Sequence, residues 1–182
     1  MHTHSDPGNP IVHDMSVPRA FDQFYEGKRL HAPKHAPRFN IPARKKVRRL
    51  PDLLQGPYIF IVASQRLRGL FETLEGANVQ SIPAKVCYDS GESEAYHFIQ
   101  VLNNVDGIDW TASDIDSEPE DRYDVICVRR LVVDPKALGD RCAIRLDGIP
   151  TELLVNQVFR DQAMKMKITG VDFVPAESFQ LG

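Results

Sequence analysis

Carboxylate side chains gather between residues 103 and 124, in the stretch NNVDGIDWTASDIDSEPEDRYD, which holds eight acidic residues and a single arginine. Acidic side chains at this density have two chemical uses: they can bind a divalent cation, or they can present negative charge to a basic partner. Asp114 and Asp116 have the spacing that opens a calcium-binding loop, but the glycine and the closing glutamate of such a loop are missing. We therefore predict no metal site.

The second use, an acidic surface that meets a basic protein, is our hypothesis for this segment, and a solvated loop without a specific role is the alternative. A protein whose active face binds nucleic acid would be a suitable partner. Trp110 strengthens the hypothesis because tryptophan is favoured at the energetic centre of protein interfaces. The candidate partner-binding residues are Asp106, Asp109, Trp110, Asp114, Asp116, Glu118, Glu120 and Asp121.

Residues that could act as nucleophiles or metal ligands do not form a recognisable set. Cys87, Cys127 and Cys142 are widely spaced, and His97 is the only histidine after residue 35. The glycine-rich phosphate loop and the GxSxG and HExxH motifs are all missing. We predict that the protein is not an enzyme and uses no cofactor, metal or small-molecule substrate. An enzyme whose dispersed active site escapes motif reading remains the alternative.

Charge is divided unevenly along the chain, whose net charge is −3. Residues 1–50 hold ten basic and four acidic residues, and the basic run RKKVRR extends from Arg44 to Arg49. Such a run could bind phosphates, so a nucleic-acid-binding module using residues 44–49 is a second functional alternative. We favour a solvated segment and expect no nucleic-acid partner, because aromatic residues do not interleave the run.

The composition indicates the compartment. The chain has 182 residues and contains no stretch near the roughly 20 apolar residues that a membrane-spanning helix needs. The first residues do not resemble a secretory signal. An odd number of cysteines without a CxxC pair fits a reducing environment. We therefore expect a cytoplasmic protein that has no membrane partner; its oligomeric state is left open.

The stretches before and after the acidic segment, which must position it, have similar sequences. Residues 54–84 and 146–176 align without a gap, with seven identities in 31 positions where roughly two are expected by chance. The identical pairs are Leu54/Leu146, Gly56/Gly148, Gln65/Gln157, Arg68/Arg160, Val79/Val171, Pro83/Pro175 and Ala84/Ala176. We interpret the two stretches as an internal duplication.

Each stretch has the pattern of a strand, a capped helix and a second strand. Ser64 and Asn156 stand at the N-cap positions, where a side-chain oxygen accepts a hydrogen bond from the first helical turn. Apolar residues follow at helical spacing. They are Leu67, Leu70, Phe71 and Leu74 in the first copy, and Val158, Phe159, Ala163 and Met166 in the second. Gly76 is placed where the first helix should end, and Pro175 should end the last strand.

The predicted fold class is α+β, with the two strand–helix–strand units flanking a mostly antiparallel β meander. Residues 84–102 should form a hairpin, and residues 103–124 should form a loop. Asp134 to Leu138 fits a short helical turn that begins with a proline. Residues 1–49, rich in proline, histidine and basic side chains, are predicted to be partly disordered or loosely packed. The folded α+β domain is predicted to span residues 50–182.

Several short runs resemble an immunity protein family of bacterial polymorphic toxin systems, the eleventh in the usual numbering. The runs are Leu50–Asp52, Val62–Phe71, Val79–Pro83, Phe98–Asp109, Leu131–Pro135, Arg145–Pro150, Leu154–Asn156 and Thr169–Pro175. The similarity covers about residues 50–178 and matches poorly before residue 50. Asn156 departs from the serine that is usual in the family, and the acidic run is longer than typical.

The resemblance implies a non-enzymatic antidote used in bacterial competition. Such a protein binds and neutralises a cognate toxin domain, which is often a nuclease, in the producing cell and its kin. This agrees with the acidic surface and with the missing catalytic motifs.

Overall fold

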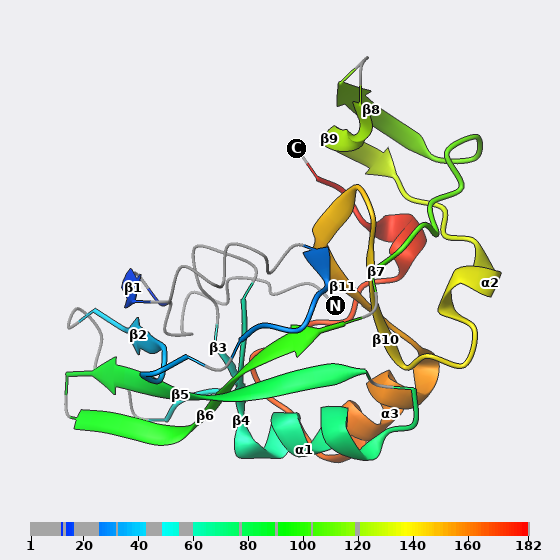
Figure 1. The fold of residues 1–182 in the computed structure, drawn as a ribbon. Helices are drawn as coiled ribbons and strands as arrows, with labels where there is room; N and C mark the ends of the chain where they lie inside the picture. The colour runs from blue at the N-terminus through cyan, green and yellow to red at the C-terminus, as the bar shows by residue number, and fades with distance from the viewer. Residues whose placement is uncertain are drawn as a thin grey trace.

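A computed structural model describes residues 12, 14–16, 26–31, 33–42, 49–54, 60–76, 78–89, 91–102, 104–118 and 121–181. Its described residues form strands for the most part, together with three α-helices and one short 3-10 helix. Figure 1 shows two long central strands, two helices packed together beneath them, and a two-stranded projection at the opposite side of the molecule.

The largest sheet has six strands in the order β1-β2-β5-β6-β4-β3. Their bounds are Asp14–Ser16 (β1), Arg38–Asn40 (β2), Leu53–Leu54 (β3), Ile61–Ser64 (β4), Val79–Tyr88 (β5) and Gly91–Val101 (β6). The long hairpin of β5 and β6 was predicted, and β6 lies between β5 and β4. Neighbouring strands are antiparallel except for β2 and β5, which run parallel.

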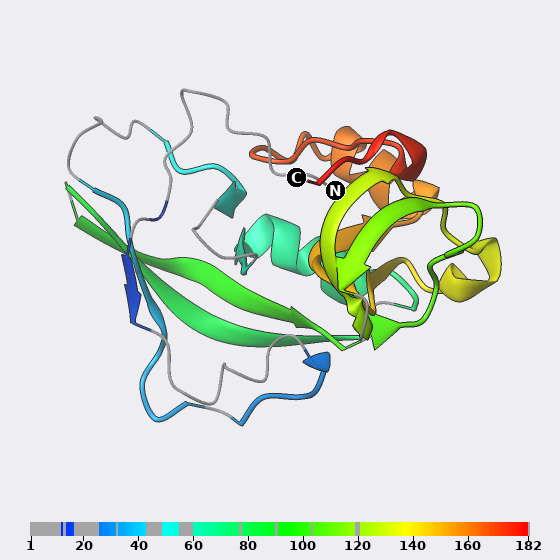
Figure 2. The same ribbon diagram turned by 90° about the horizontal axis from the view of Figure 1, so that it is seen from above.

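Side chains that alternate along the strands of this sheet belong to two apolar clusters, one on each face. On β6, Phe98 belongs to the cluster that contains Leu30 and Phe39 of the N-terminal region, whereas Ile99 belongs to the cluster under the helices. Figure 2 shows the consequence: the N-terminal segment and helix α1 (Gln65–Thr73) lie on opposite sides of the β5–β6 ribbon. The sheet is therefore covered on both faces.

Two smaller sheets complete the fold. Strands β11 (Ile149–Val155), β10 (Ala143–Leu146) and β7 (Asn104–Val105) form one, with β7 parallel to β10. Strands β8 (Asp114–Glu118) and β9 (Asp121–Arg130) form the other. We call this β8–β9 hairpin the arm, because it stands out from the body in Figure 1. The short helix α2 (Pro135–Leu138) follows it and confirms the predicted helical turn; Asp134 is its N-cap.

The arm corrects the prediction of a loop at residues 103–124, since strands β7 and β8 and the start of β9 lie there. Charged and turn-forming residues had indicated a loop, but pairing with β9 supplies hydrogen bonds that local sequence does not reveal. The predicted meander is also divided, because β5–β6 belongs to the large sheet and β8–β9 stands apart.

The repeated unit is confirmed in its strand and its helix. Strand β4 leads into α1 and strand β11 into α3 (Gln157–Lys165), and each helix has nine residues. Ser64 accepts a hydrogen bond from the Leu67 amide at 3.3 Å, and Asn156 accepts one from the Phe159 amide at 2.9 Å. Both predicted caps are thus present. In both copies, the strand that leads into the helix pairs with an antiparallel strand that precedes it in the chain. These pairs are β3 with β4, and β10 with β11.

Three details of the duplication differ from the prediction. The first copy continues into the ten-residue strand β5, but residues 168–175 form no regular strand in the second. Val158 is 56% exposed and Met166 is 36% exposed, so only Phe159 and Ala163 form the buried stripe of α3. The units also do not flank a meander. Instead α1 and α3 pack on each other, and the Phe71 and Phe159 rings lie 4.9 Å apart.

The described residues before 50 contribute to the first apolar cluster. Val12, Leu30, Phe39 and Ile41 are all buried there. The Gln80 side chain binds both backbone groups of Leu30, accepting from its amide at 2.7 Å and donating to its carbonyl at 2.8 Å. The domain boundary near residue 50 stays a prediction, and most of the basic run 44–49 lies outside the described residues. Across the described part of the chain, no helix is long and apolar enough to cross a membrane.

Candidate functional site

The acidic candidate residues lie along the arm and at its base. Asp106 and Asp109 precede β8, Asp114 and Asp116 lie on it, and all four are exposed. Glu118 ends β8 and Asp121 begins β9, although their side chains are outside the described set, as is the whole of Glu120. The structure thus places Asp114, Asp116, Glu118 and Asp121 on the projecting arm, with Asp106 and Asp109 before it in the chain at its base.

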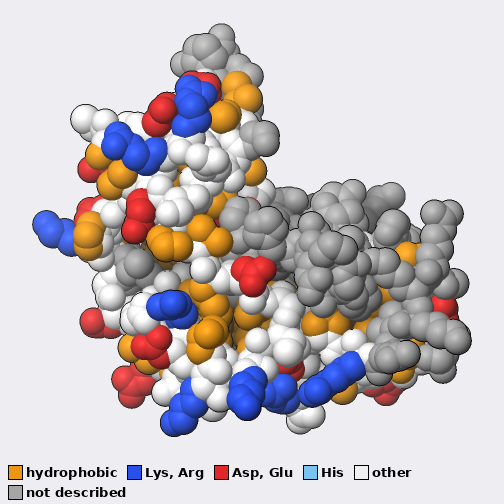
Figure 3. Space-filling model, turned by 180° about the vertical axis from the view of Figure 1, so that it is seen from behind, with side chains coloured by type: hydrophobic (Ala, Val, Ile, Leu, Met, Phe, Trp, Pro, Cys, Tyr) orange, Lys and Arg blue, Asp and Glu red, His pale blue; other side chains and the backbone are white. Residues whose placement is uncertain are grey.

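Arg129 on β9 neutralises part of this charge. Its Nε lies 3.2 Å from Asp114 Oδ1, and its Nη1 lies 2.8 Å from Asp116 Oδ2. Hydrogen bonds from Arg129, together with its positive charge, lower the pKa of Asp116 below the ordinary value. Figure 3 shows acidic and basic side chains next to each other on the arm, at the upper left. Asp114 and Asp116 are therefore members of an ion-pair network rather than isolated negative charges.

The register of the arm explains why Arg129 reaches both carboxylates. Asp114 pairs with Arg130 while Ile115 pairs with Val128, so Arg129 is an extra residue in a β-bulge. A second irregularity places Ile126 between the paired residues Val125 and Cys127. Bulges change the direction of a side chain, and Ile126 is 57% exposed. The sequence reading missed this exposed apolar residue, because the bulge depends on the register with β8.

Trp110 occupies a turn at the base of the arm. Asp109 Oδ1 accepts hydrogen bonds from the amides of Thr111 and Ala112 at 3.1 and 3.0 Å, which fixes the turn. The Trp110 ring is half-buried against the third apolar cluster, which contains Ile108, Val128 and Leu131 among its buried residues. The ring therefore supports the arm from below, and part of it borders a surface hollow formed with Val132 to Pro135.

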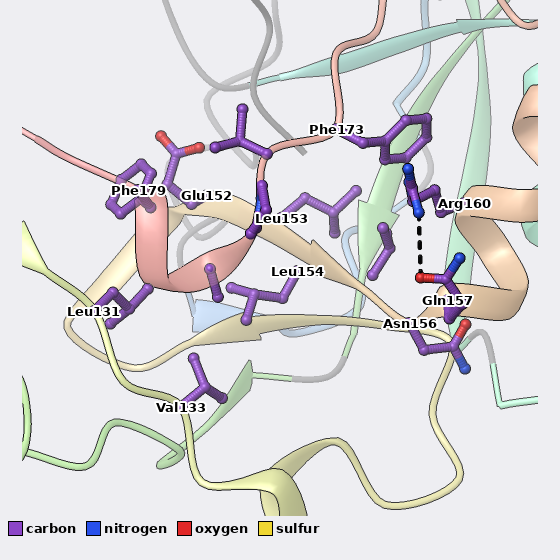
Figure 4. Close-up of a pocket in the computed structure, with 14 residues that line it drawn as sticks. Leu131, Val133, Glu152, Leu153, Leu154, Asn156, Gln157, Arg160, Phe173 and Phe179 are labelled. Carbon is purple, nitrogen blue, oxygen red and sulfur yellow. Dashed lines mark hydrogen bonds between the residues drawn. The ribbon is translucent and has the colours of Figure 1, made fainter.

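A second hollow, the groove, opens on the other side of the Leu131–Val133 linker. It has a volume of about 340 Å³ and lies between β11, the start of α3 and the C-terminal segment. Figure 4 shows Leu131, Leu154 and Phe179 toward one end, and Phe173 with Arg160 at the other. The remaining lining residues are Val133, Glu152, Leu153, Val155, Asn156, Gln157, Val174, Pro175 and Ala176. The sequence reading did not identify this groove.

The C-terminal segment joins the groove to the arm. Val128 on β9 and Leu181 exchange two backbone hydrogen bonds, of 2.8 and 2.9 Å. Phe179, which lines the groove, is buried in the same cluster as Val128. The arm and the groove are therefore neighbouring parts of one surface.

Groups with catalytic potential remain apart. Cys87, Cys127 and Cys142 are free thiols, and burial raises the pKa of the Cys142 thiol. The His97 ring lies beside Arg68 on α1, with 2.9 Å between His97 Nε2 and Arg68 Nη1. Within the described ranges, His, Cys, Asp and Glu side chains form no group of three that could hold a metal ion.

A surface that combines a charged arm with an apolar groove is suited to binding another protein. Comparison with protein-family models matches residues 6–178 to the Immunity protein family (Imm11). The chain belongs to this family, whose members are non-enzymatic binders that neutralise a cognate toxin. The match begins at residue 6, not near residue 50 as the sequence reading indicated, so it includes β1 and β2. A comparison with curated proteins found no match.

Proposed function

We propose that the protein neutralises a toxin with a basic active face, such as a nuclease, and that the arm makes the first contact. The observation that carries this proposal is the concentration of acidic residues on the arm and on the segment at its base, residues 104–113. Residues 104–130 hold eight acidic residues and three arginines, whereas the net charge of the whole chain is only −3. The remainder of the chain is therefore net positive, and the arm together with the segment at its base supplies the negative field.

The proposed mechanism of recognition has an electrostatic and an apolar part. A nuclease must hold phosphates, so its active face is positive, and a negative arm increases the rate of encounter. Because exposed ion pairs contribute only about 0–1 kcal/mol each, charge alone does not give a long-lived complex. Ile126 offers an apolar contact beside the charges, since it is 57% exposed on β9.

The ion pairs of Arg129 refine the roles of individual carboxylates. Asp106 and Asp109 are exposed at the base of the arm and are not ligands of Arg129, so we assign them to the part of the surface that meets the partner beside the arm. Asp114 and Asp116 hold Arg129 and thereby fix the bulge. A basic partner can compete with Arg129 for these two carboxylates. Displacing Arg129 is favourable only if the partner offers more than one cationic side chain.

Association kinetics test the proposal. The partner is the purified toxin domain encoded by the neighbouring open reading frame, measured at low and high salt. In the test variant, Asp114, Asp116, Glu118, Glu120 and Asp121 are changed to Asn or Gln. The control variant neutralises five acidic residues away from the arm, namely Glu26, Glu75, Asp89, Glu94 and Asp140.

We expect the test variant to associate roughly tenfold more slowly at low salt and to lose most of its salt dependence. The control variant removes the same amount of charge and should associate nearly as fast as the wild type. Equal rates for all three proteins would show that the arm is solvated surface. Binding of nucleic acid by the antidote itself, in place of the toxin, would favour the alternative based on residues 44–49.

A further inference from the structure

We infer that the groove docks an extended segment of the cognate toxin, one that places a bulky apolar side chain next to a carboxylate. This inference rests on the proposed function insofar as the occupant is the toxin. It adds a second contact, whose role is to hold the complex after the arm has made the encounter.

The size and lining of the groove indicate the apolar part of the occupant. Its volume of about 340 Å³ is within the range of sites that enclose a compact ligand. Leucine, valine, proline and phenylalanine side chains form most of the wall, and Figure 4 shows them facing the space between β11 and the C-terminal segment. An apolar side chain that enters the groove loses water on the sides that face this wall, and the bound toxin segment would cover the open side, as at interface anchors.

The charge at one end of the groove indicates the carboxylate. Arg160 lines the groove, and its Nη1 donates a 3.4 Å hydrogen bond to Gln157 of the same helix. No carboxylate among the described residues forms an ion pair with Arg160. Glu152, the acidic residue of the lining, already interacts within the protein. The end of the groove that Arg160 lines, beside Phe173, is therefore positive, whereas Glu152 lies toward the other end, beside Phe179 (Figure 4).

The duplication provides an internal comparison for this arginine. Arg68 occupies the same position in α1, where its Nε lies 2.7 Å from Glu72 Oε1 and its Nη1 lies 2.9 Å from His97. The residue that corresponds to Glu72 in α3 is Met164, which is 63% exposed. The first copy thus satisfies its arginine with a carboxylate one turn later, and the second copy leaves the same arginine available beside an apolar groove.

This comparison supplies a precise perturbation. Met164→Glu would copy the Arg68–Glu72 pair into α3, because residues four apart on a helix face each other. Gln162→Glu adds the same charge to the same helix but two residues from Arg160, where side chains do not meet, so it is the matched control. Ala176→Trp, at the start of the 3-10 helix Ala176–Ser178, fills the groove without removing a core side chain.

The first experiment uses 1-anilinonaphthalene-8-sulfonate, a fluorescent probe with an apolar ring system and one negative charge. We expect saturable binding to the wild type, and binding at least roughly fivefold weaker to Met164→Glu and Ala176→Trp, while Gln162→Glu binds like the wild type. Circular dichroism melts establish that each variant is folded. If neither groove variant weakens the binding of the probe, the groove is not an accessible site and the inference is wrong.

The second experiment adds the purified toxin domain. Displacement of the probe, together with roughly tenfold faster dissociation of toxin from Ala176→Trp and Met164→Glu, would support the inference. If the toxin binds but leaves the probe in place and dissociates from all variants at the wild-type rate, the inference fails while the proposed function stands. If the toxin does not bind the wild type at all, the proposed function is wrong, and the inference that the toxin occupies the groove is wrong with it.

Discussion

Replacing Asp52 with alanine should destabilise the protein more than any single surface change, because its buried carboxylate joins the start of α1 to the segment that follows α3. Asp52 is 6% exposed. It accepts hydrogen bonds from the Ser64 hydroxyl at 2.7 Å, from the Thr169 amide at 3.0 Å and from the Thr169 hydroxyl at 3.0 Å. Arg66 adds an ion pair of 3.1 Å.

The magnitude follows from what each donor loses. A hydrogen bond to a charged group contributes about 1.5–3 kcal/mol when buried, but Thr169 is partly exposed, so water replaces some of its loss. The Arg66 side chain is 45% exposed, and its pair with Asp52 contributes about 0–1 kcal/mol. The Ser64 hydroxyl, which caps α1, would also lose its fixed orientation. We expect a total loss of about 3 kcal/mol.

Urea unfolding followed by circular dichroism measures this free energy, and a thermal melt should show a fall in Tm of about 6–12 °C. Arg66→Ala is the control, with an expected loss of about 1 kcal/mol or less. Hydrogen exchange of the Leu67 amide should also accelerate in Asp52→Ala, because that amide donates to Ser64. A loss below about 1 kcal/mol for Asp52→Ala, or an equal loss for Arg66→Ala, would refute the reasoning.

Burial, and then the neighbouring positive charge of Arg68, lower the pKa of His97. Because the pKa of His97 in the folded state is below the unfolded value of about 6.5, unfolding takes up a proton, and stability should fall as pH decreases below about 6.5. Urea unfolding of wild type and His97→Gln at pH 5 and 7.5 measures this effect. Equal pH dependence of the two proteins would contradict it. Gly69 lies inside α1 with open space around an added Cβ, so Gly69→Ala should stabilise the protein by about 0.5–1 kcal/mol. Gly76 has φ +77°, and a Cβ would lie 2.5 Å from the Asp140 carbonyl oxygen, so Gly76→Ala should destabilise it by more than 1 kcal/mol. Thermal melts of both glycine variants check the two opposite signs.

Features with local causes were predictable from the sequence. The caps Ser64 and Asn156 were identified because a cap and the amide that it binds are three residues apart. The short helix after Asp134 was identified from another local signal, the proline at its first position, and its cap is local too, since Asp134 Oδ1 accepts a hydrogen bond from the Lys136 amide at 2.9 Å. In these cases the partners lie within the window that sequence patterns describe.

Features that depend on distant partners were missed or assigned incorrectly. Val158 was placed on the buried stripe because it is apolar and adjoins Phe159, but α3 packs through Phe159 against Phe71, which leaves Val158 exposed. Strand β8 was assigned as part of a loop because its carboxylates are poor strand formers, whereas Arg129, fifteen residues after Asp114, pairs with them. The groove combines three separate segments, so no single pattern indicated it.

The contact between the two repeats affects how the protein folds during its synthesis. Asp52 and Thr169 are 117 residues apart, yet they close one hydrogen-bonded cluster beneath α1 and α3. Synthesis proceeds from the N-terminus at about 5–20 residues per second, so Thr169 is added roughly 6–23 s after Asp52. Until Phe159 has been added, Leu67 and Phe71 lack this partner, so the apolar cluster that the two repeats share cannot close before most of the chain has been made.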